Sequence, residues 1–164
     1  MRRGITRLIL AGALMCGAAS AWAGSATTFL QVSVNVVPNC RLSITDLAFG
    51  NYDPLLDNVD RPLDGAAQLQ MVCTKNSQAS VMFDFGQHGV GSNRGMALGS
   101  DRVSYDLFRD SARTQRWADS ADALHVVGTG SRDPQQFTVF GRVPAGQEVG
   151  AGAYSDIVTA TVDF

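Results

Sequence analysis

Apolar and polar residues alternate along the segment Thr28–Val37, which is followed at once by Pro38. Successive side chains of a strand point to opposite faces, so every second residue of this segment would share one apolar face. The residues on that face are Leu30, Val32, Val34 and Val36. Proline has no N–H to give to a strand ladder, so pairing should stop at Pro38. The pattern therefore predicts a strand with one dry side.

The apolar face of this strand could pack in two places, and the sequence of the segment alone does not distinguish between them. It could be the first strand of the molecule's own sandwich. It could instead fill a groove in a neighbouring molecule, by adding a strand to an open sheet edge.

The rest of the chain repeats this alternation in short segments separated by turns. The segments that predict strands are 41–45, 67–73, 81–85, 103–107, 124–127, 137–143 and 154–164. In the last of them Val158, Ala160, Val162 and Phe164 share one face. About seven short strands favour an all-β fold, a two-sheet antiparallel sandwich. No hairpin partner is expected after the last strand, which would leave an open edge of the kind that recruits other strands.

The N-terminal region has the three parts of a secretory leader. Arginines stand at positions 2, 3 and 7, a mostly apolar run covers 8–19, and Ala21-Trp22-Ala23 is a small-x-small cleavage site. We expect export with cleavage after Ala23, and the apolar run is too short to span a membrane. Cys16 offers a lipoprotein alternative, but Met15 is bulky where a lipid-attachment site requires a small residue.

Composition and charge exclude one large class of partner. Charged residues make up 17% of the chain, against roughly 25% in an average soluble protein. The 13 basic residues nearly cancel the 15 acidic ones, and Lys75 is the only lysine. This is not the balance of a nucleic-acid-binding protein. The length suits one domain, so the expected division is 1–23 leader, 24–39 N-terminal strand and linker, and 40–164 folded domain.

Two cysteines, Cys40 and Cys73, remain once the leader is removed. In an exported chain such a pair is most simply a disulfide. Closing a loop of this length stabilises a fold by about 3.5–4 kcal/mol in the chain-entropy model. A metal site is the rival interpretation, and it fails because His88 and His125 lack any close ligand spacing. We therefore expect neither a metal nor another cofactor.

The remaining candidate chemistry is weak. The acids between Asp53 and Asp64 match no calcium-loop spacing, and a solvated loop is the simpler interpretation. The glycine-rich stretch 86–95 is not followed by a helix that could bind a phosphate. Trp117 could stack on a sugar, although an aromatic residue in such a place more often covers the edge of a core.

Taken together, several motifs resemble one family, the spore coat protein U domain family, which includes subunits of archaic chaperone–usher pili. The first half of the pattern comprises Leu47-Ala48-Phe49-Gly50-Asn51-Tyr52-Asp53-Pro54, Cys73-Thr74, Arg94 through Met96, and Ser104-Tyr105-Asp106-Leu107-Phe108. The second half comprises Trp117 with Asp119, Thr138 through Gln147, and Gly152-Ala153-Tyr154-Ser155-Asp156. The likeness covers essentially the whole mature chain, with Ala118 standing where the family commonly has glycine.

The resemblance implies an incomplete immunoglobulin-like antiparallel β-sandwich that lacks its last strand. In such pili a periplasmic chaperone lends a strand to the gap. The N-terminal segment of a neighbouring subunit later replaces it at an outer-membrane usher. The resemblance thus favours donation of Thr28–Val37 to a neighbour, with the strand that contains Val158, Ala160, Val162 and Phe164 at the acceptor edge.

Other functions remain as alternatives to a structural pilus subunit. A secreted carbohydrate-binding or adhesive module would use Trp117, Tyr105 and the loops. A spore or surface coat protein would follow from the family name and use the same fold. An exported enzyme is disfavoured, because the sequence has no Gly-x-Ser-x-Gly motif and no Ser or Cys partner is evident for either histidine.

Overall fold

A computed structural model describes residues 23–164 of the protein. The expected leader and its cleavage site lie outside these residues, apart from Ala23 itself. The chain falls into two units, one that extends up to Asn35 and one that comprises Val36–Phe164, and each is described by itself. No helix of the described residues is long and apolar enough to cross a membrane.

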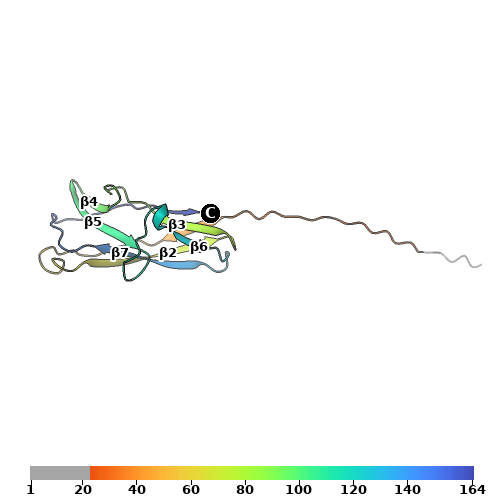
Figure 1. The fold of residues 1–164 in the computed structure, drawn as a ribbon, viewed down its shortest axis with the longest axis horizontal. Coiled ribbons are helices and arrows are strands. Elements are labelled where there is room, and N and C mark those ends of the chain that lie inside the picture. The colour runs from red at the N-terminus through yellow and green to blue at the C-terminus, as the bar shows by residue number, and fades with distance from the viewer. Residues whose placement is uncertain (1–22) are drawn as a thin grey trace, which may run out of the picture. The chain divides into compact units, whose positions relative to one another are not determined.

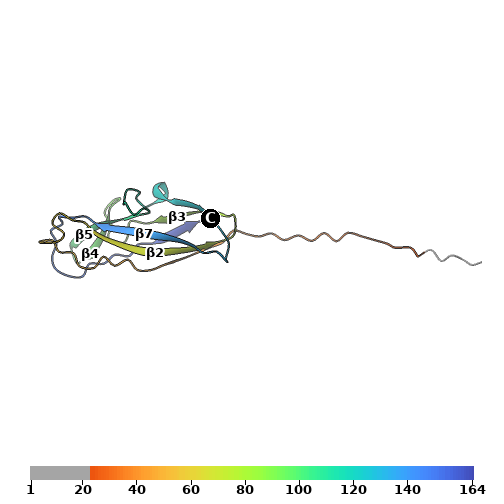
Figure 2. The same cartoon turned by 90° about the horizontal axis from the view of Figure 1, so that it is seen from below.

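The second unit is built from strands that form two antiparallel sheets. One sheet has the order β1-β2-β7-β5-β4 and the other has the order β6-β3-β8. The strands are β1 Cys40–Ile44, β2 Leu63–Cys73, β3 Gln78–Phe83, β4 Arg94–Leu98, β5 Asp101–Phe108, β6 Leu124–Val127, β7 Gln135–Val143 and β8 Ala160–Asp163. A short 3₁₀ helix, Ser120–Asp122, precedes β6. The two sheets form the layers of an immunoglobulin-like sandwich, as the sequence predicted (Figures 1 and 2).

Two stretches that were not predicted as strands are part of the sheets. The stretch Arg94–Leu98 is strand β4, although its residues Gly95, Met96 and Ala97 show no alternation that would have revealed it. Strand β2 begins at Leu63, inside the predicted loop, because its register with β7 continues to Leu63 opposite Val143.

The core lies between the inward faces of the two sheets. Alternate residues of β2, β3, β5 and β7 are buried there, as their alternation requires. They are Ala67, Leu69, Met71, Cys73, Val81, Phe83, Val103, Tyr105, Leu107, Val139 and Val143. Trp117 is fully buried among them, where its Nε1–H donates to the carbonyl of Val81 at 2.9 Å. Its ring meets that of Phe83 edge to face, with centroids 5.0 Å apart.

A buried arginine cross-links the two sheets. Arg94 at the start of β4 is 1% exposed. Its guanidinium donates to the carbonyls of Phe83 and Asp84 at the end of β3, at 3.1 and 2.8 Å. It also donates to the carbonyl of Trp117 at 2.9 Å and to the Asp106 carboxylate on β5 at 2.6 Å. A buried charge is tolerated only when it is paired in this way, so Arg94 fixes how β3, β4 and β5 meet.

A pair of glycines on the inner face makes room for the chain that follows β1. Gly65 on β2 lies opposite Gly141 on β7. A Cβ on Gly141 would come within 2.9 Å of Leu47 and 2.8 Å of Phe49. At Gly65 it would lie 3.1 Å from each of the same two side chains. Leu47 and Phe49 are therefore seated on this bare patch of the sheet, and the residues around them stay close to the core without joining a sheet.

The last strand is shorter than predicted. Strand β8 spans only Ala160–Asp163, so Val158 precedes it and Phe164 follows it. The cause is Asp84, whose carboxylate accepts the N–H of Thr159 at 2.9 Å where a β3 carbonyl would continue the ladder. Further back, Ser155 exchanges hydrogen bonds with Ala97 of β4, in the other sheet. Residues 154–159, the crossing segment, thus pass from the edge of one sheet to the edge of the other.

The segment 28–37 forms no strand within the described residues. The four side chains of its apolar face are exposed, from 71% at Val36 to 88% at Val34. A strand requires a partner for its backbone groups, and this segment has none among strands β1–β8. The segment is therefore not one of the eight strands of the two described sheets.

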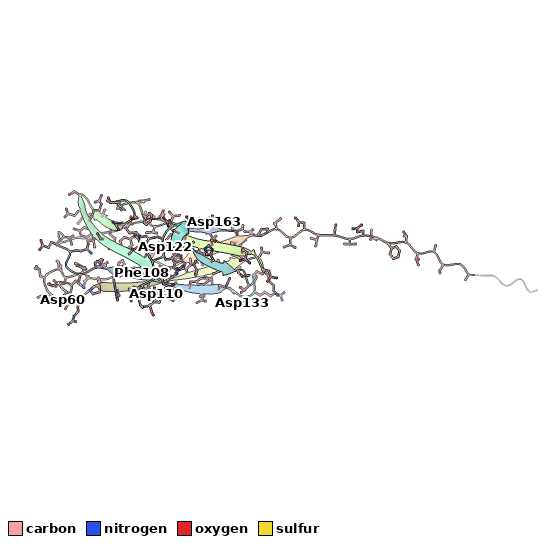
Figure 3. All side chains as sticks on the ribbon, viewed as in Figure 1. Asp60, Phe108, Asp110, Asp122, Asp133 and Asp163 are labelled. Atoms are coloured by element: carbon pink, nitrogen blue, oxygen red, sulfur yellow. A yellow bond between two sulfur atoms is a disulfide. The ribbon has the colours of Figure 1, made fainter. Side chains whose placement is uncertain are left out.

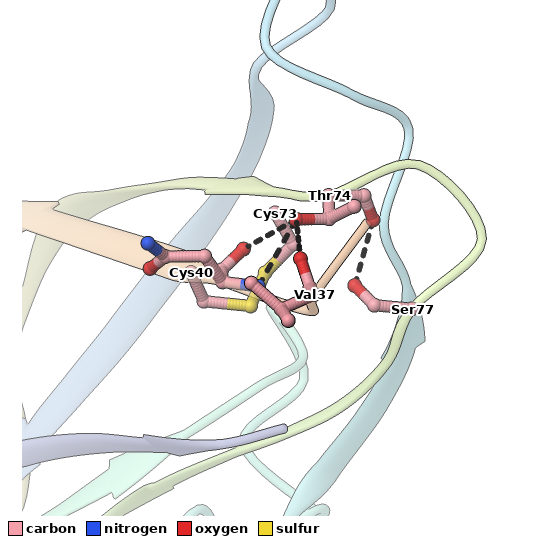
Figure 4. The surroundings of a disulfide bond; sticks show 6 residues. Val37, Cys40, Cys73, Thr74 and Ser77 are labelled. Carbon is pink, nitrogen blue, oxygen red and sulfur yellow. Dashed lines mark hydrogen bonds between the residues drawn. A yellow bond between two sulfur atoms is a disulfide. The ribbon is translucent and has the colours of Figure 1, made fainter. Parts of the chain in front are cut away.

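The disulfide between Cys40 and Cys73 is confirmed (Figure 4). The two cysteines are partners in the β1–β2 register, and their Cα atoms are 4.1 Å apart. Beside the bond, the Thr74 hydroxyl accepts the N–H of Asn39 at 3.0 Å and lies 3.4 Å from the carbonyl of Val37. The disulfide thus fixes the start of the domain at the point where the N-terminal segment joins it.

Replacing either Cys40 or Cys73 with serine should lower the free energy of unfolding of the mature chain by about 2–5 kcal/mol. The reason is that the unfolded chain regains the freedom of a loop that spans 33 positions in sequence. Urea unfolding followed by tryptophan fluorescence measures the change. Thiol labelling of the folded wild-type chain without reductant provides the control, and ready labelling of both cysteines would contradict the disulfide.

Candidate functional site: an open groove between two sheet edges

A large groove opens on one side of the sandwich. Its volume is about 1550 Å³, compared with roughly 300–1,000 Å³ for a typical small-molecule site. Two continuous stretches of chain line it, residues 44–55 after β1 and residues 148–158 before β8. The groove is thus bounded by two long, roughly extended stretches of backbone, which suits a segment of polypeptide better than a small compound.

The floor of the groove is the apolar core itself. Side chains from β2, β3, β4, β5 and β7 reach it, and Leu63 and Met96 among them are only partly covered. They are Leu63, Ala67, Phe83, Met96, Val103, Tyr105, Leu107, Val139 and Val143. Half-buried apolar side chains from the two bounding stretches join them, namely Leu47, Phe49, Tyr52, Val149, Tyr154 and Val158. The groove is therefore a gap in the hydrophobic core, open to water.

One rim of the groove has free backbone groups. Thr159 bonds to Asp84 and Ile157 bonds to Gln87, so these residues direct their backbone groups toward β3 and the loop after it. Within residues 23–164, the N–H and C=O groups of Asp156 and Val158 have no hydrogen-bond partner. Because antiparallel partners alternate, Ala160 and Val162 continue the same open side along β8.

The other rim, formed along β1, also has free backbone groups. Asn39 and Thr45 bond to Thr74 and Gln68 of the β2 side, so alternation directs the backbone groups of Cys40, Leu42 and Ile44 away from β2. No strand of the described chain pairs with β1 or β8 along these free sides. Two unpaired edges thus flank one apolar gap, which is what a sheet requires to accept an added strand.

A buried carboxylate anchors the crossing segment. The Asp156 side chain is 2% exposed, and it accepts the Tyr105 hydroxyl at 2.7 Å. It also accepts the backbone N–H of His88 at 3.1 Å and lies 3.0 Å from the Nδ1 atom of the same residue. Burial, together with the hydrogen bond to Asp156, raises the pKa of Tyr105, so its hydroxyl remains a donor. The carboxylate thus holds this rim against β5 while the backbone of Asp156 stays free.

Asp84 anchors the same segment at the start of β8. Its carboxylate accepts the N–H of Thr159 at 2.9 Å and the N–H of Gly86 at 3.0 Å. Desolvation alone would raise the pKa of Asp84, but these backbone donors outweigh it and the pKa lies below 3.8. The crossing segment is therefore tied down at both ends by carboxylates rather than by a continuous ladder.

The structure brings together most of the residues that were predicted for the acceptor edge. Val158 lines the groove, and Ala160 and Val162 lie on the same half-buried side of β8. Phe164 lies beyond the strand and is 55% exposed. The predicted donor residues Leu30, Val32, Val34 and Val36 are all exposed. The cysteines lie at the end of the sandwich where β1 begins.

Sequence reasoning missed the other wall and the anchors. Leu47 and Phe49 were named only as part of a family motif, although their alternate spacing is a signal that one side of this stretch is apolar. Nothing local to Asp156 or Asp84 reveals that their carboxylates bind backbone and tyrosine groups distant in sequence. Each role depends on contacts that only the folded chain creates.

The two aromatic residues considered for sugar binding are not surface residues. Trp117 is 0% exposed and Tyr105 is 7% exposed. A smaller cavity of about 430 Å³ lies near Trp117, between β6, β7 and the loop after β5. Two of its polar side chains are already engaged within that loop, because Asp110 accepts the N–H groups of Thr114 and Gln115 and Arg109 donates to Gln115.

Comparison with known proteins identifies the family. The sequence model of the Spore Coat Protein U domain matches residues 26–161, nearly the whole chain after the expected leader. The chain belongs to the Spore Coat Protein U domain family. The match begins before Thr28, so the N-terminal segment is part of the domain as the family defines it.

Two proteins illustrate what this Spore Coat Protein U domain is similar to. One is Protein U of Myxococcus xanthus, which is 33% identical over 95% of this chain and 94% of its own length. The other is a chain of the CsuC–CsuE chaperone–tip adhesion subunit pre-assembly complex from archaic chaperone–usher Csu pili of Acinetobacter baumannii. It is 24% identical with a TM-score of 0.57, over 79% of this chain and 40% of that chain, and it shows a shared fold. The present chain thus spans less than half the length of that structural neighbour.

Replacing Asp156 with alanine should lower the free energy of unfolding by about 1–3 kcal/mol, because the Tyr105 hydroxyl is then buried without its acceptor. Urea unfolding of the mature chain measures the loss. Tyr105→Phe is the matched control, since it removes the donor and leaves no unpaired hydroxyl. The double variant should lose less than the sum of the two single losses, and strict additivity would show that the two groups do not interact.

The pH dependence of stability should reveal the anchoring by Asp84. Its pKa is lower in the folded chain than the ordinary 3.8, so its contribution is present above that pH and is lost as the pH falls through the folded value. Asp84→Asn keeps an acceptor oxygen but does not titrate. The difference in urea midpoint between wild type and Asp84→Asn should therefore shrink from pH 5 to pH 2.5. A difference that stays constant would contradict the role of the charge.

Proposed function

We propose that this protein is a structural subunit of a surface pilus of the archaic chaperone–usher class, and that its subunits join by donor-strand complementation. In this proposal residues 28–37, the donor segment, leave their own domain and lie in the groove of the next subunit. Leu30, Val32, Val34 and Val36 enter the apolar gap, and the segment's backbone bonds to the free edges of the rims. The proposal assigns no catalytic role to the chain.

One combination of features carries the proposal. The same chain has a gap in its core flanked by free strand edges, and an exposed segment with one apolar face. Each feature alone is unfavourable in water, because exposed apolar area and unpaired strand edges favour association. The two are complementary in chemistry, and the groove walls are about as long as the segment.

The magnitudes are consistent with stable assembly. Burial of four aliphatic side chains contributes about 6–12 kcal/mol before the entropy of ordering the segment is subtracted. Each backbone hydrogen bond formed along the rims adds about 0.5–1.5 kcal/mol. The sum before entropy is comparable with the whole stability of a small domain. A subunit should thus be marginal alone and robust once its groove is filled.

The proposal implies further partners and a route. A periplasmic chaperone would fill the groove before assembly, and an outer-membrane usher would be the place where the neighbouring subunit's donor segment replaces it. The chain would pass through the periplasm and reside at the cell surface in the fibre. The likeness to a chain of the Acinetobacter complex, which joins a chaperone and a pilus subunit, supports this assignment.

A surface or spore coat is the second candidate, and the family name together with the likeness to Protein U favours it. Coat assembly would use the same groove and donor segment, so the two candidates differ in the final structure rather than in the joining chemistry. The secreted sugar-binding alternative has less support, because Trp117 and Tyr105 are buried.

Substituting Val32 or Val34 with aspartate should stop polymerisation and leave the chaperone-bound subunit soluble. These side chains are exposed in the single subunit, so a charge there is harmless until it must enter the dry groove of a neighbour. The assay co-expresses each variant with its chaperone, purifies the complex and supplies wild-type subunit. The variants should accept a wild-type donor segment but fail to act as donors themselves.

Two further sets of variants complete the test. Ser33→Asp places the same charge on the opposite face of the donor segment and should polymerise nearly as well as wild type. Val158→Asp and Val162→Asp should yield little soluble complex, because these residues belong to the subunit's own core and groove. If Val32→Asp unfolds the domain as badly as Val162→Asp does, the segment is an internal strand and the proposal fails.

A further inference from the structure

The loop 54–61 exposes two leucines to water, and the buried side chain of Asn58 fixes the loop in place. Leu55 is 83% exposed and Leu56 is 75% exposed, and their N–H groups both donate to the Asp53 carboxylate, at 2.9 and 3.0 Å. Asn58 is only 5% exposed. Its side chain accepts the N–H of Asp53 at 2.8 Å and donates to the carbonyl of Arg61 at 3.1 Å. The leucines are thus presented by a fixed loop rather than by a loose one.

This loop lies at the far end of the sandwich, the end opposite the disulfide. The Gly146 N–H donates to the carbonyl of Asn58 at 2.8 Å, and Gly146 follows the last residue of β7. The disulfide end holds Cys40–Cys73 and the turn after β6, where the Gly130 N–H donates to the carbonyl of Cys73. Asp60 and Asp133 mark the two ends in Figure 3.

The disulfide end also exposes apolar side chains. Val127, the last residue of β6, is 48% exposed and Phe164, just after β8, is 55% exposed. Their strands meet β3 near its start, at Gln78 and Ser80, which places both residues toward the disulfide end. Each end of the sandwich thus carries apolar side chains that its own domain does not cover.

The charges of the two ends are opposite in balance. At the far end acidic residues outnumber basic ones: Asp57, Asp60, Asp101 and Glu148 are exposed there beside Arg61 and Arg102. At the disulfide end basic residues outnumber acidic ones: Arg41, Lys75 and Arg132 are exposed beside Asp133 and Asp163. Surfaces with this arrangement attract one another when stacked head to tail.

We infer that the loop 54–61 docks against the disulfide end of the next copy of this chain, and forms a second contact between subunits beside the donor strand. This inference rests on the proposed function. Strand β8 runs toward the disulfide end and β1 runs away from it, so a segment between the two rims is antiparallel to one and parallel to the other. The proposed acceptor strand is β8, and the described sheets pair only antiparallel strands. A donor segment antiparallel to β8 therefore has its C-terminal end, Val37, near the far end of the acceptor.

The tether between donor segment and domain is short. Only Pro38 and Asn39 separate Val37 from Cys40. A donor segment seated in the groove thus brings its own disulfide end within reach of the acceptor's loop 54–61. Leu55 lines the groove as well as belonging to this loop, so the two contacts are continuous. Because the tether is short, the partner of the loop is the domain that supplies the donor segment, which is a second copy of this chain.

The experiment separates the two contacts by using two probes. The first probe is a synthetic peptide of residues 28–37, which carries a donor segment but no domain, and its binding to the mature chain is measured by fluorescence anisotropy. The second is polymerisation of the mature chain, followed by light scattering at low and high salt. The variants are Leu56→Ser and Asp60→Lys. Their controls are Val90→Ser, with Val90 74% exposed outside the loop, and Asp122→Lys on the flank of the sandwich.

Both loop variants should bind the peptide as wild type does. In polymerisation, Leu56→Ser should weaken the chain–chain affinity about tenfold, from the lost burial of one leucine. Asp60→Lys should slow association about threefold at low salt, and high salt should abolish this difference. Adding Lys75→Glu to Asp60→Lys also reverses the charge at the disulfide end, and this double variant should regain the wild-type association rate. The two control variants should polymerise at the wild-type rate.

The outcomes distinguish the inference from the function on which it rests. If the peptide does not bind to the wild-type chain, donor-strand complementation itself fails. If the peptide binds but Leu56→Ser and Asp60→Lys polymerise as their controls do, the second contact is wrong while the donor-strand proposal stands. Loss of peptide binding in Leu56→Ser would also overturn the inference, because the loop would then act only through the groove.

Discussion

The free edges of β1 and β8 are the constraint on which the rest of the structure depends. A strand buried on one face must still satisfy its backbone groups on both sides, and these two strands do so on one side only within the described chain. Between them the core is open to water along residues 44–55 and 148–158. A compact domain would normally close such a gap with its own chain, and here a segment of suitable pattern, residues 28–37, is exposed.

Maintaining an open gap requires that its rims do not collapse onto each other. Three arrangements described above prevent this. The Gly65–Gly141 pair seats Leu47 and Phe49 and thereby fixes one rim. The carboxylates of Asp84 and Asp156 hold the other rim at both ends. Arg94 fixes the strands beneath by bonding three carbonyls and a carboxylate. Buried polar groups thus keep the gap open, whereas hydrophobic contacts alone would close it.

Alternation in the sequence was sufficient to predict the all-β class and most strands, and the cysteine count of an exported chain predicted the disulfide. Alternation failed where long-range contacts override the local pattern. Alternation continues from Val158 to Phe164, yet the Asp84 carboxylate ends the ladder at Thr159. Strand β4 shows no alternation because buried Arg94 and Gly95 occupy both of its first positions. The anchors of the groove are polar residues whose partners lie 51 and 75 positions away, and no local pattern encodes such pairs.

The position of the disulfide has a mechanical consequence for a fibre built in the proposed way. Tension between subunits would enter each domain at Pro38 and Asn39, directly before the five-residue edge strand β1. The Cys40–Cys73 bond passes that load at once to β2, an 11-residue strand with partners on both sides. Pulling would then shear the long β2–β7 ladder as well, instead of stripping away the short β1 edge alone. Strand β1, the short edge strand, thus does not bear the force alone. A stretched fibre would then separate first at the contacts between subunits.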